Sequence, residues 1–141
     1  MESTTRTVIT VESVINAPVD KVWKFWTRPE YVTQWNHASD DWHSPHAEND
    51  FRVGGKFLYK MAARDGSFEF DFWGVYDYIK SNELIAYTLG DGRKVTVRFL
   101  ENGPETKVEE SFEAENVNAA ELQKHGWQSI LNNFKKFVEN N

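Results

Sequence analysis

The 141-residue chain contains no cysteine, and this absence excludes several kinds of chemistry. Disulfide frameworks, thiolate nucleophiles and cysteine-ligated zinc all need a sulfur that the chain does not carry. Long apolar runs are absent too: no stretch of about 18 apolar residues occurs, and the opening segment MESTTRTVITVES lacks the apolar core of a signal peptide. The sequence therefore predicts a cytoplasmic protein that does not insert into a membrane.

Positive charge is scarce. Lys and Arg number 16 against 22 Asp and Glu, which gives a formal net charge of −6, and there is no basic run. Nucleic acids and anionic membranes attract basic surfaces, so this balance argues against both as principal partners. A chain of this length can bury a substantial core, and we expect one domain over residues 1–141.

Aromatic residues, by contrast, are abundant: they make up 15% of the chain and include six Trp. Large aromatic side chains fill protein cores, and they also line ligand cavities. Composition alone leaves both interpretations open.

The middle of the chain shows strand-like stretches separated by turn signals at short, regular intervals. Gly after Asp or Asn supplies the positive φ of a tight hairpin, and the spacing leaves no room for crossover helices, so we expect antiparallel pairing. A β-branched first strand over 8–15 precedes strands near 47–53, 56–63, 67–80, 84–90, 93–101 and 105–115, with a bulge expected at Gly74. The turn signals are Gly54-Gly55, Asp65-Gly66, Ser81-Asn82-Glu83, Asp91-Gly92 and Asn102-Gly103-Pro104.

Helical patterns occupy both ends. Asn16 is the expected cap of a first short helix, and a capping-box pattern of Thr27 with Glu30 opens a second that runs to about Trp35. Asn118 and Glu121 form another such pattern before a long amphipathic helix to about residue 138. The chain is thus predicted to be an α+β protein, in which a curved antiparallel sheet wraps around one long C-terminal helix.

The segment 36–46 is predicted to be a loop and holds five side chains that could bind a metal. These are His37, Asp40, Asp41, His43 and His46. Their spacing matches no regular ligand pattern, so a solvated polar loop is the expected outcome, with no metal and no other cofactor.

Glu110 is a charged residue on a strand face that is otherwise predicted to point inward. It shares its predicted strand face with Val108 and Phe112, and a carboxylate on an inward face must be paired, hydrogen-bonded or protonated. A functional contact inside a pocket is one possibility. The others are an edge position open to water, an error of strand register, or a structural pair with Arg98 or Arg52. No residue is assigned as catalytic.

Four stretches give the chain a family resemblance: INAPVDKVWKFWT (15–27), QWNHASDDW (34–42) with NDFRVGGKFLYKMAARDG (49–66), FDFWGVYDYI (70–79) and GWQSILNNF (126–134). With the order strand, two short helices, six-stranded meander and long helix, they resemble the helix-grip proteins of the START-like (SRPBCC) superfamily. Within it, the chain is similar to the branch of homologues of the heat-shock-protein ATPase activator, which is grouped with polyketide cyclases.

The resemblance implies a hydrophobic cavity between the concave face of the sheet and the long helix. The function we expect is binding of a small hydrophobic molecule, lipid-like or aromatic, by a monomer or weak homodimer that is not an enzyme. The alternatives are a cyclase or hydratase acting on a polyketide-like substrate, and a chaperone-associated stress-response module. The candidate ligand-binding residues are Trp35, Trp42, Phe57, Tyr59, Phe70, Phe72, Tyr76, Tyr87, Phe99, Glu110, Trp127 and Leu131.

Overall fold

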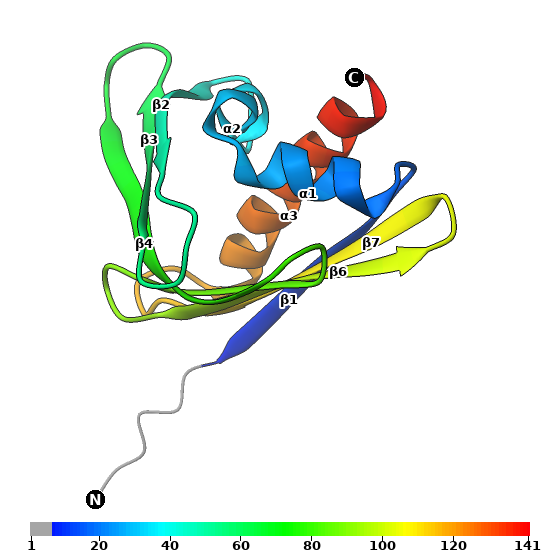
Figure 1. Ribbon diagram of the computed structural model, residues 1–141. Helices are drawn as coiled ribbons and strands as arrows, with labels where there is room; N and C mark the ends of the chain where they lie inside the picture. The colour runs from blue at the N-terminus through cyan, green and yellow to red at the C-terminus, as the bar shows by residue number, and fades with distance from the viewer. Residues whose placement is uncertain (1–6) are drawn as a thin grey trace, which may run out of the picture.

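A computed structural model describes residues 7–141 as a seven-stranded antiparallel sheet that curls around a C-terminal helix (Figure 1). The predicted α+β class and the helix-grip fold are confirmed. The sheet order is β1-β7-β6-β5-β4-β3-β2, so the first strand of the chain closes one edge beside the last. The elements are β1 (Val8–Ile15), α1 (Val19–Thr27), α2 (Pro29–Trp35), β2 (Trp42–Asn49), β3 (Lys56–Ala63), β4 (Glu69–Lys80), β5 (Leu84–Leu89), β6 (Lys94–Asn102), β7 (Glu105–Glu113) and α3 (Ala120–Glu139).

The five turn signals of the sequence all lie in turns of the meander. Each contains one residue with a positive φ, at Gly54, Gly66, Asn82, Gly92 and Gly103. The Cβ atom makes this conformation costly for most residues; Gly has no Cβ, and Asn accepts the conformation more readily than other residues do. These residues therefore end one strand and allow the next to return antiparallel.

The predicted loop over 36–46 is wrong in its second half, because β2 begins at Trp42. The Oγ of Ser44 donates a hydrogen bond to the carbonyl of Lys60 on β3, and the register shifts between His43 and His46. Pro45 lies inside that irregularity, where the ladder does not need its missing N–H. An edge strand that is polar and interrupted by proline carries little apolar alternation, so periodicity did not reveal it.

The expected bulge at Gly74 is also misplaced, because the register of β4 with β5 shifts between Tyr76 and Tyr78. Tyr76 is therefore buried while Tyr78 is exposed, although residues two positions apart share a face in a regular strand. Gly74 has a packing role instead. A Cβ there would lie 2.8 Å from the carbonyl oxygen of Thr88 and 2.9 Å from the ring of Phe57, so the glycine lets that ring pack on the strand.

None of the helices begins with the side-chain cap that the sequence predicted. The residues at the cap positions of α1, α2 and α3 are Pro18, Arg28 and Ala119, and none makes a side-chain capping bond. The hydroxyl of Thr27 instead donates to the carbonyl of Trp23, and the side chain of Asn118 binds Glu115. Two of the three predicted caps, Thr27 and Asn118, are thus engaged in other hydrogen bonds.

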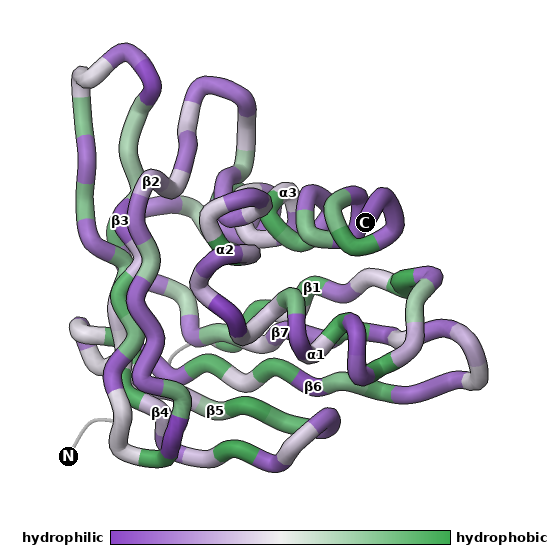
Figure 2. Tube along the Cα trace, turned by 45° about the horizontal axis from the view of Figure 1, so that its top comes forward, coloured by the Kyte–Doolittle hydropathy of each residue, from purple (hydrophilic) through white to green (hydrophobic). Residues whose placement is uncertain are grey.

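The core lies between the concave face of the sheet and α3. Leu131, Phe134 and Val138 of α3 are fully buried, and the strands that face them alternate buried with less buried residues. Figure 2 shows the corresponding alternation of hydrophobic and hydrophilic residues along β6. The ring of Phe134 contacts those of Trp26 and Trp35, at centroid distances of 4.9 and 4.7 Å, so α1 and α2 cover the other side of the helix. Within residues 7–141, no helix is long and apolar enough to span a bilayer.

Candidate functional site

A cavity of about 400 Å³ lies between the concave sheet and the N-terminal half of α3. Nine of the twelve candidate residues from the sequence line it: Trp35, Phe57, Tyr59, Phe70, Phe72, Tyr76, Tyr87, Glu110 and Trp127. They come from α2, from four strands and from α3, so only the folded chain brings them together.

Three of the candidates lie outside the cavity, and each has a packing reason. Trp42 lies against Phe68 and Phe70, at ring-centroid distances of 6.1 and 6.0 Å. Phe99 faces inward but is covered by the indole of Trp26, which lines the cavity in its place. Leu131 is fully buried in the core, since one helical step turns it away from the neighbouring lining residue Ile130.

The sequence missed twelve lining residues. Met61 and Ile85 carried a usable signal, because each shares a strand face with aromatic candidates. Arg93 carried a signal as well, because it opens the predicted strand 93–101 in phase with the inward-facing Val95 and Val97; in the structure it lies just before β6. The missed residues are Trp26, Asn36, Ala38, Met61, Ile85, Arg93, Glu115, Asn118, Leu122, Gln123, Gly126 and Ile130.

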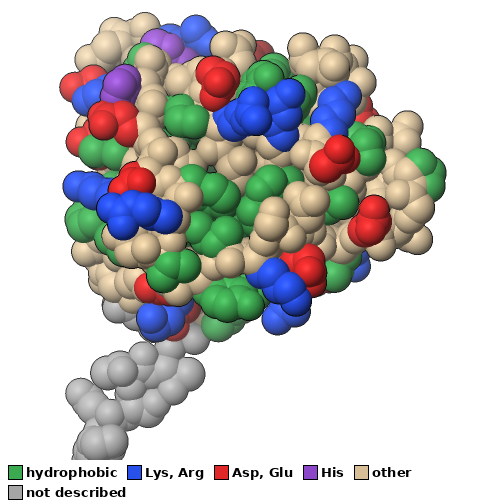
Figure 3. Space-filling view, in the orientation of Figure 1, with side chains coloured by type: hydrophobic (Ala, Val, Ile, Leu, Met, Phe, Trp, Pro, Cys, Tyr) green, Lys and Arg blue, Asp and Glu red, His purple; other side chains and the backbone are tan. Residues whose placement is uncertain are grey.

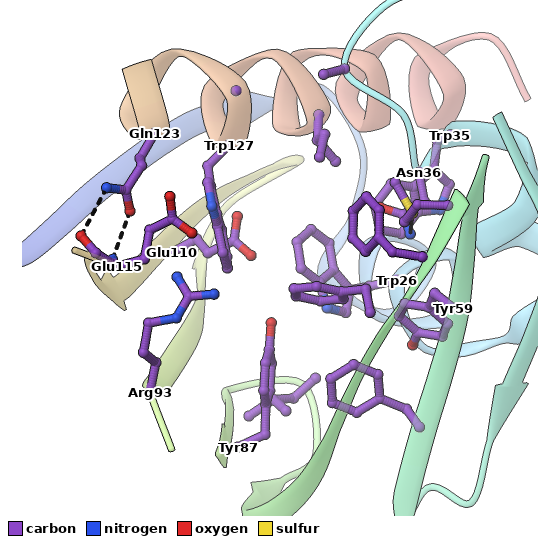
Figure 4. A pocket seen from close by; sticks show the side chains of 18 of the residues that line it. Trp26, Trp35, Asn36, Tyr59, Tyr87, Arg93, Glu110, Glu115, Gln123 and Trp127 are labelled. Atoms are coloured by element: carbon purple, nitrogen blue, oxygen red, sulfur yellow. Dashed lines mark hydrogen bonds between the residues drawn. The ribbon is translucent and has the colours of Figure 1, made fainter. Parts of the chain in front are cut away.

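The two ends of the cavity differ in chemistry, as Figure 4 shows. Aromatic rings, among them Trp26, Trp35 and Tyr59, surround one end. The indole N–H of Trp35 donates to the carbonyl of Phe25 at 3.0 Å, which fixes the ring. Polar side chains from β7, from the β5–β6 turn and from α3 gather at the other end. The site is therefore amphipathic along its length.

Glu110 belongs to the polar end and is 6% exposed. Its strand β7 runs between β1 and β6, so the position is not an edge, and the predicted face shared with Val108 and Phe112 is confirmed. No hydrogen bond or ion pair to its carboxyl occurs within residues 7–141, and the alternative of a structural pair with Arg98 or Arg52 is not realised: Arg52 binds Asp50 instead. Burial without a partner raises the pKa of Glu110 to about 8, so the carboxyl keeps its proton at neutral pH.

Arg93 approaches the same end of the cavity with a side chain that is 13% exposed. Its Nε–H donates to Oδ2 of Asp91 at 2.8 Å, and its Nη1–H donates to the carbonyl of Glu113 at 3.3 Å. These contacts hold the guanidinium in place and use two of its five N–H groups.

Three tyrosines of the lining carry buried hydroxyl groups. Burial raises the pKa of Tyr76 to about 12 and that of Tyr59 and Tyr87 well above the usual range, so all three stay protonated. The hydroxyl of Tyr76 donates to Oδ1 of Asn49 at 2.7 Å, and the Asn49 amide donates in turn to the carbonyl of Thr27. The hydroxyl of Tyr87 has no such partner and extends into the cavity (Figure 4).

The histidines and aspartates of segment 36–46 are not gathered into one site. Among residues 7–141 no group of three or more His, Asp or Glu is placed to hold a metal ion. Nε2 of His46 lies 2.7 Å from Glu48, and Nε2 of His37 lies 3.0 Å from the side-chain nitrogen of Asn133. Burial, followed by the positive charge of Arg64, lowers the pKa of His37.

Comparison with known proteins places this geometry in a family. Residues 16–139 match the family described as activator of Hsp90 ATPase homolog 1-like protein. No curated protein matches the chain.

Three solved structures illustrate the likeness. An AHSA1-like protein from Aeromonas hydrophila is 39% identical, with a TM-score of 0.89 over 95% of this chain and 93% of that one. A protein from Cytophaga hutchinsonii is 53% identical, with a TM-score of 0.82 over 94% and 92%. A protein from Chromobacterium violaceum is 21% identical, with a TM-score of 0.86 over 96% and 99%, and shows the fold alone. From the family match and these identities, the chain belongs to the activator of Hsp90 ATPase homolog 1-like family, within the START-like superfamily.

Proposed function

We propose that the protein binds a small hydrophobic molecule, lipid-like or aromatic, in the cavity between the sheet and α3. The observation that carries the proposal is the cavity itself, whose volume of about 400 Å³ lies in the range typical of small-molecule sites and whose lining includes nine aromatic residues. Burial of apolar ligand surface against such walls contributes about 25 cal/mol per Å². The charged side chains on the face shown in Figure 3 are of both signs and mixed, which suits a small ligand better than a polyanion.

Trp127 is the wall residue that we expect to contribute most. Its indole stacks on Phe112 with a centroid distance of 3.9 Å and an interplanar angle of 9°, and it meets the edge of Phe72 at 6.0 Å. The ring is therefore held rigidly with one face on the sheet while it lines the cavity. A preorganised aromatic surface loses little conformational entropy when a ligand packs on it.

Replacing Trp127 by Ala is expected to weaken binding of a neutral apolar probe, N-phenylnaphthylamine, by about tenfold or more. The loss follows from the apolar area that the indole presents. Affinity is measured by fluorescence titration, with circular dichroism to verify the fold. Trp73→Ala is the matched control: Trp73 lies on β4 next to Phe72, outside the cavity lining, and its loss is expected to leave probe affinity within about twofold. Unchanged affinity in a folded Trp127→Ala protein would defeat the cavity as the binding site.

One observation favours a second function, proton transfer to or from a bound ligand. Glu110 is a buried carboxyl in the cavity with a pKa raised to about 8, close to the working pH at which a general acid or base is most effective. A cyclase or hydratase acting on a polyketide-like substrate needs such a group.

The catalytic alternative predicts that the protein accelerates hydrogen–deuterium exchange at the central carbon of an aromatic 1,3-diketone, followed by NMR. Glu110→Gln keeps shape and hydrogen-bonding capacity but cannot transfer a proton, so the protein-catalysed rate is expected to fall by roughly 10²–10⁴-fold. Probe binding would change much less. An exchange rate that is equal with and without the protein leaves binding as the function.

A chaperone-associated role is the remaining alternative and is suggested by the family description alone. A cytoplasmic location and a monomer or weak homodimer stay predictions.

A further inference from the structure

The polar end of the cavity holds hydrogen-bond donors that lack an acceptor. Figure 4 shows the guanidinium of Arg93, the carboxyl of Glu110 and the hydroxyl of Tyr87 extending toward the same part of the cavity. They come from the β5–β6 turn, from β7 and from β5. Neither Glu110 nor the Tyr87 hydroxyl makes a hydrogen bond to any residue of the described chain, 7–141.

At neutral pH all three groups act as donors. Arg93 can only donate, and three of its five N–H groups have no acceptor within residues 7–141. The buried carboxyl of Glu110 keeps its proton, and so does Tyr87. These donors open on the cavity and not on a protein acceptor, so a bound molecule can supply the acceptor that they lack.

Each of the neighbouring carboxylates already accepts a hydrogen bond from the protein. No ion pair joins Arg93 to Glu110, and Asp91, which pairs with Arg93, does so through Nε. The other carboxylate of the lining, Glu115, accepts the backbone N–H of Asn118. On α3, the amide of Gln123 donates to the carbonyls of Glu115 and Asn118.

We propose that Arg93, Glu110 and Tyr87 form a carboxylate-binding site, so that the ligand is an apolar molecule that carries one carboxylic acid. This inference deepens the proposed function and rests on it. A guanidinium matches the two oxygens of a carboxylate in a bidentate arrangement, and the hydroxyl groups of Glu110 and Tyr87 donate to the same oxygens. The apolar part of the ligand then packs against Trp26, Trp35 and Tyr59 at the aromatic end.

One acid group fits this end of the cavity better than a phosphate. Among residues 7–141, Arg93 is the one basic residue of the cavity lining, and Asp91 already offsets part of its charge. A phosphate near neutral pH carries up to two negative charges, and the second would be buried without compensation. A carboxylate brings one charge.

The test compares naphthoate with its methyl ester, two aromatic molecules that differ in the acid group. Binding is measured at pH 7 by displacement of N-phenylnaphthylamine, and naphthoate is expected to bind about ten- to a hundredfold more tightly than the ester. Arg93→Met is expected to remove this preference while the ester binds as before. The matched control, Arg98→Met, removes the same charge from an exposed position on β6 and is expected to keep the preference.

Measuring the two affinities as a function of pH is a second test, and it does not require the Arg93 variant to fold. Above about pH 8 Glu110 loses its proton and repels a carboxylate, so the preference for naphthoate is expected to decline between about pH 7 and 9. Tyr87, which faces it, keeps its proton over this range, because burial raises the pKa of its hydroxyl well above the usual value. Glu110→Gln retains a donor and is expected to bind naphthoate within about threefold of the wild type at pH 7, with no decline up to pH 9.

Equal affinities for naphthoate and its ester, or a preference that survives in folded Arg93→Met protein, overturn the carboxylate site and leave the proposed function standing. Failure of both molecules to displace the probe, together with unchanged probe affinity in Trp127→Ala, overturns the proposed function as well.

Discussion

Deletion of residues 118–141 is expected to abolish cooperative folding of the remaining chain. The deletion removes α3, whose Leu131, Phe134 and Val138 are fully buried, and uncovers the concave face of the sheet. Each of these buried side chains contributes about 1.5–3 kcal/mol, and their sum is comparable with the 5–15 kcal/mol that stabilises a typical domain. Urea unfolding followed by circular dichroism, together with light scattering, should show a broad or absent transition and aggregation. A soluble fragment of residues 1–117 that unfolds cooperatively would be incompatible with the helix-grip packing.

A single substitution tests the same packing in a chain that can still fold. Phe134→Ala is expected to lower the free energy of unfolding by about 3–5 kcal/mol, because it leaves a cavity between Trp26 and Trp35. Phe68→Ala makes the same change at a residue that is 59% exposed, and the expected loss there is below about 1 kcal/mol. Equal losses at the two positions would contradict the burial of α3.

Glu110 is expected to make the protein less stable as the pH rises from about 4.5 to about 8. In the unfolded chain the carboxyl titrates near the ordinary glutamate pKa of 4.5, whereas in the folded protein burial raises that pKa to about 8. Between these values the folded state holds the proton and the unfolded state does not, so stability is full below pH 4.5 and is lost as the pH rises to 8. The loss from this one group is on the order of 4 kcal/mol, since each pKa unit corresponds to about 1.4 kcal/mol.

Glu110→Gln isolates this contribution from all other titrating groups. The difference in unfolding free energy between the variant and the wild type should shift in favour of glutamine by roughly 4 kcal/mol between about pH 4.5 and 8.5, measured by urea unfolding. Glu109→Gln makes the same change on the outward face of β7 and is expected to alter stability by less than about 0.5 kcal/mol at either pH. If the difference in unfolding free energy between Glu110→Gln and the wild type does not depend on pH, the Glu110 carboxyl is either exposed to solvent or paired in the folded protein.

The effect of Glu110 on stability and its proposed role toward a ligand have the same origin, which is the burial of its carboxyl. A buried carboxyl with no protein partner destabilises the fold at neutral pH, and a leucine or glutamine in its place would not carry this penalty. Destabilising groups of this kind are typically kept where function needs them. Its place beside Arg93 and Tyr87 at the polar end of an aromatic cavity supports a role in holding or protonating a ligand.

The sequence by itself determined the meander, the closing helix and the inward face of Glu110. These features are local, since a hairpin turn needs a residue that accepts positive φ, and the side chains of a strand or helix repeat with a fixed period. The residues Gly66, Asn82 and Gly103 mark turns, and the alternation of Val108, Glu110 and Phe112 places all three on one face.

Only the tertiary structure decided which inward residues meet an open cavity and which fill the core. Phe99 and Trp26 both face inward, and it is the packing of α1 on β6 that puts the indole in front of the phenyl ring. The bulge between Tyr76 and Tyr78 reverses a strand face, and the β5–β6 turn carries Arg93 to Glu110, 17 positions further along the chain. Periodicity predicts which side chains face inward. It does not predict whether an inward side chain lines the cavity or is covered by others, because that depends on contacts between segments that lie far apart in the sequence.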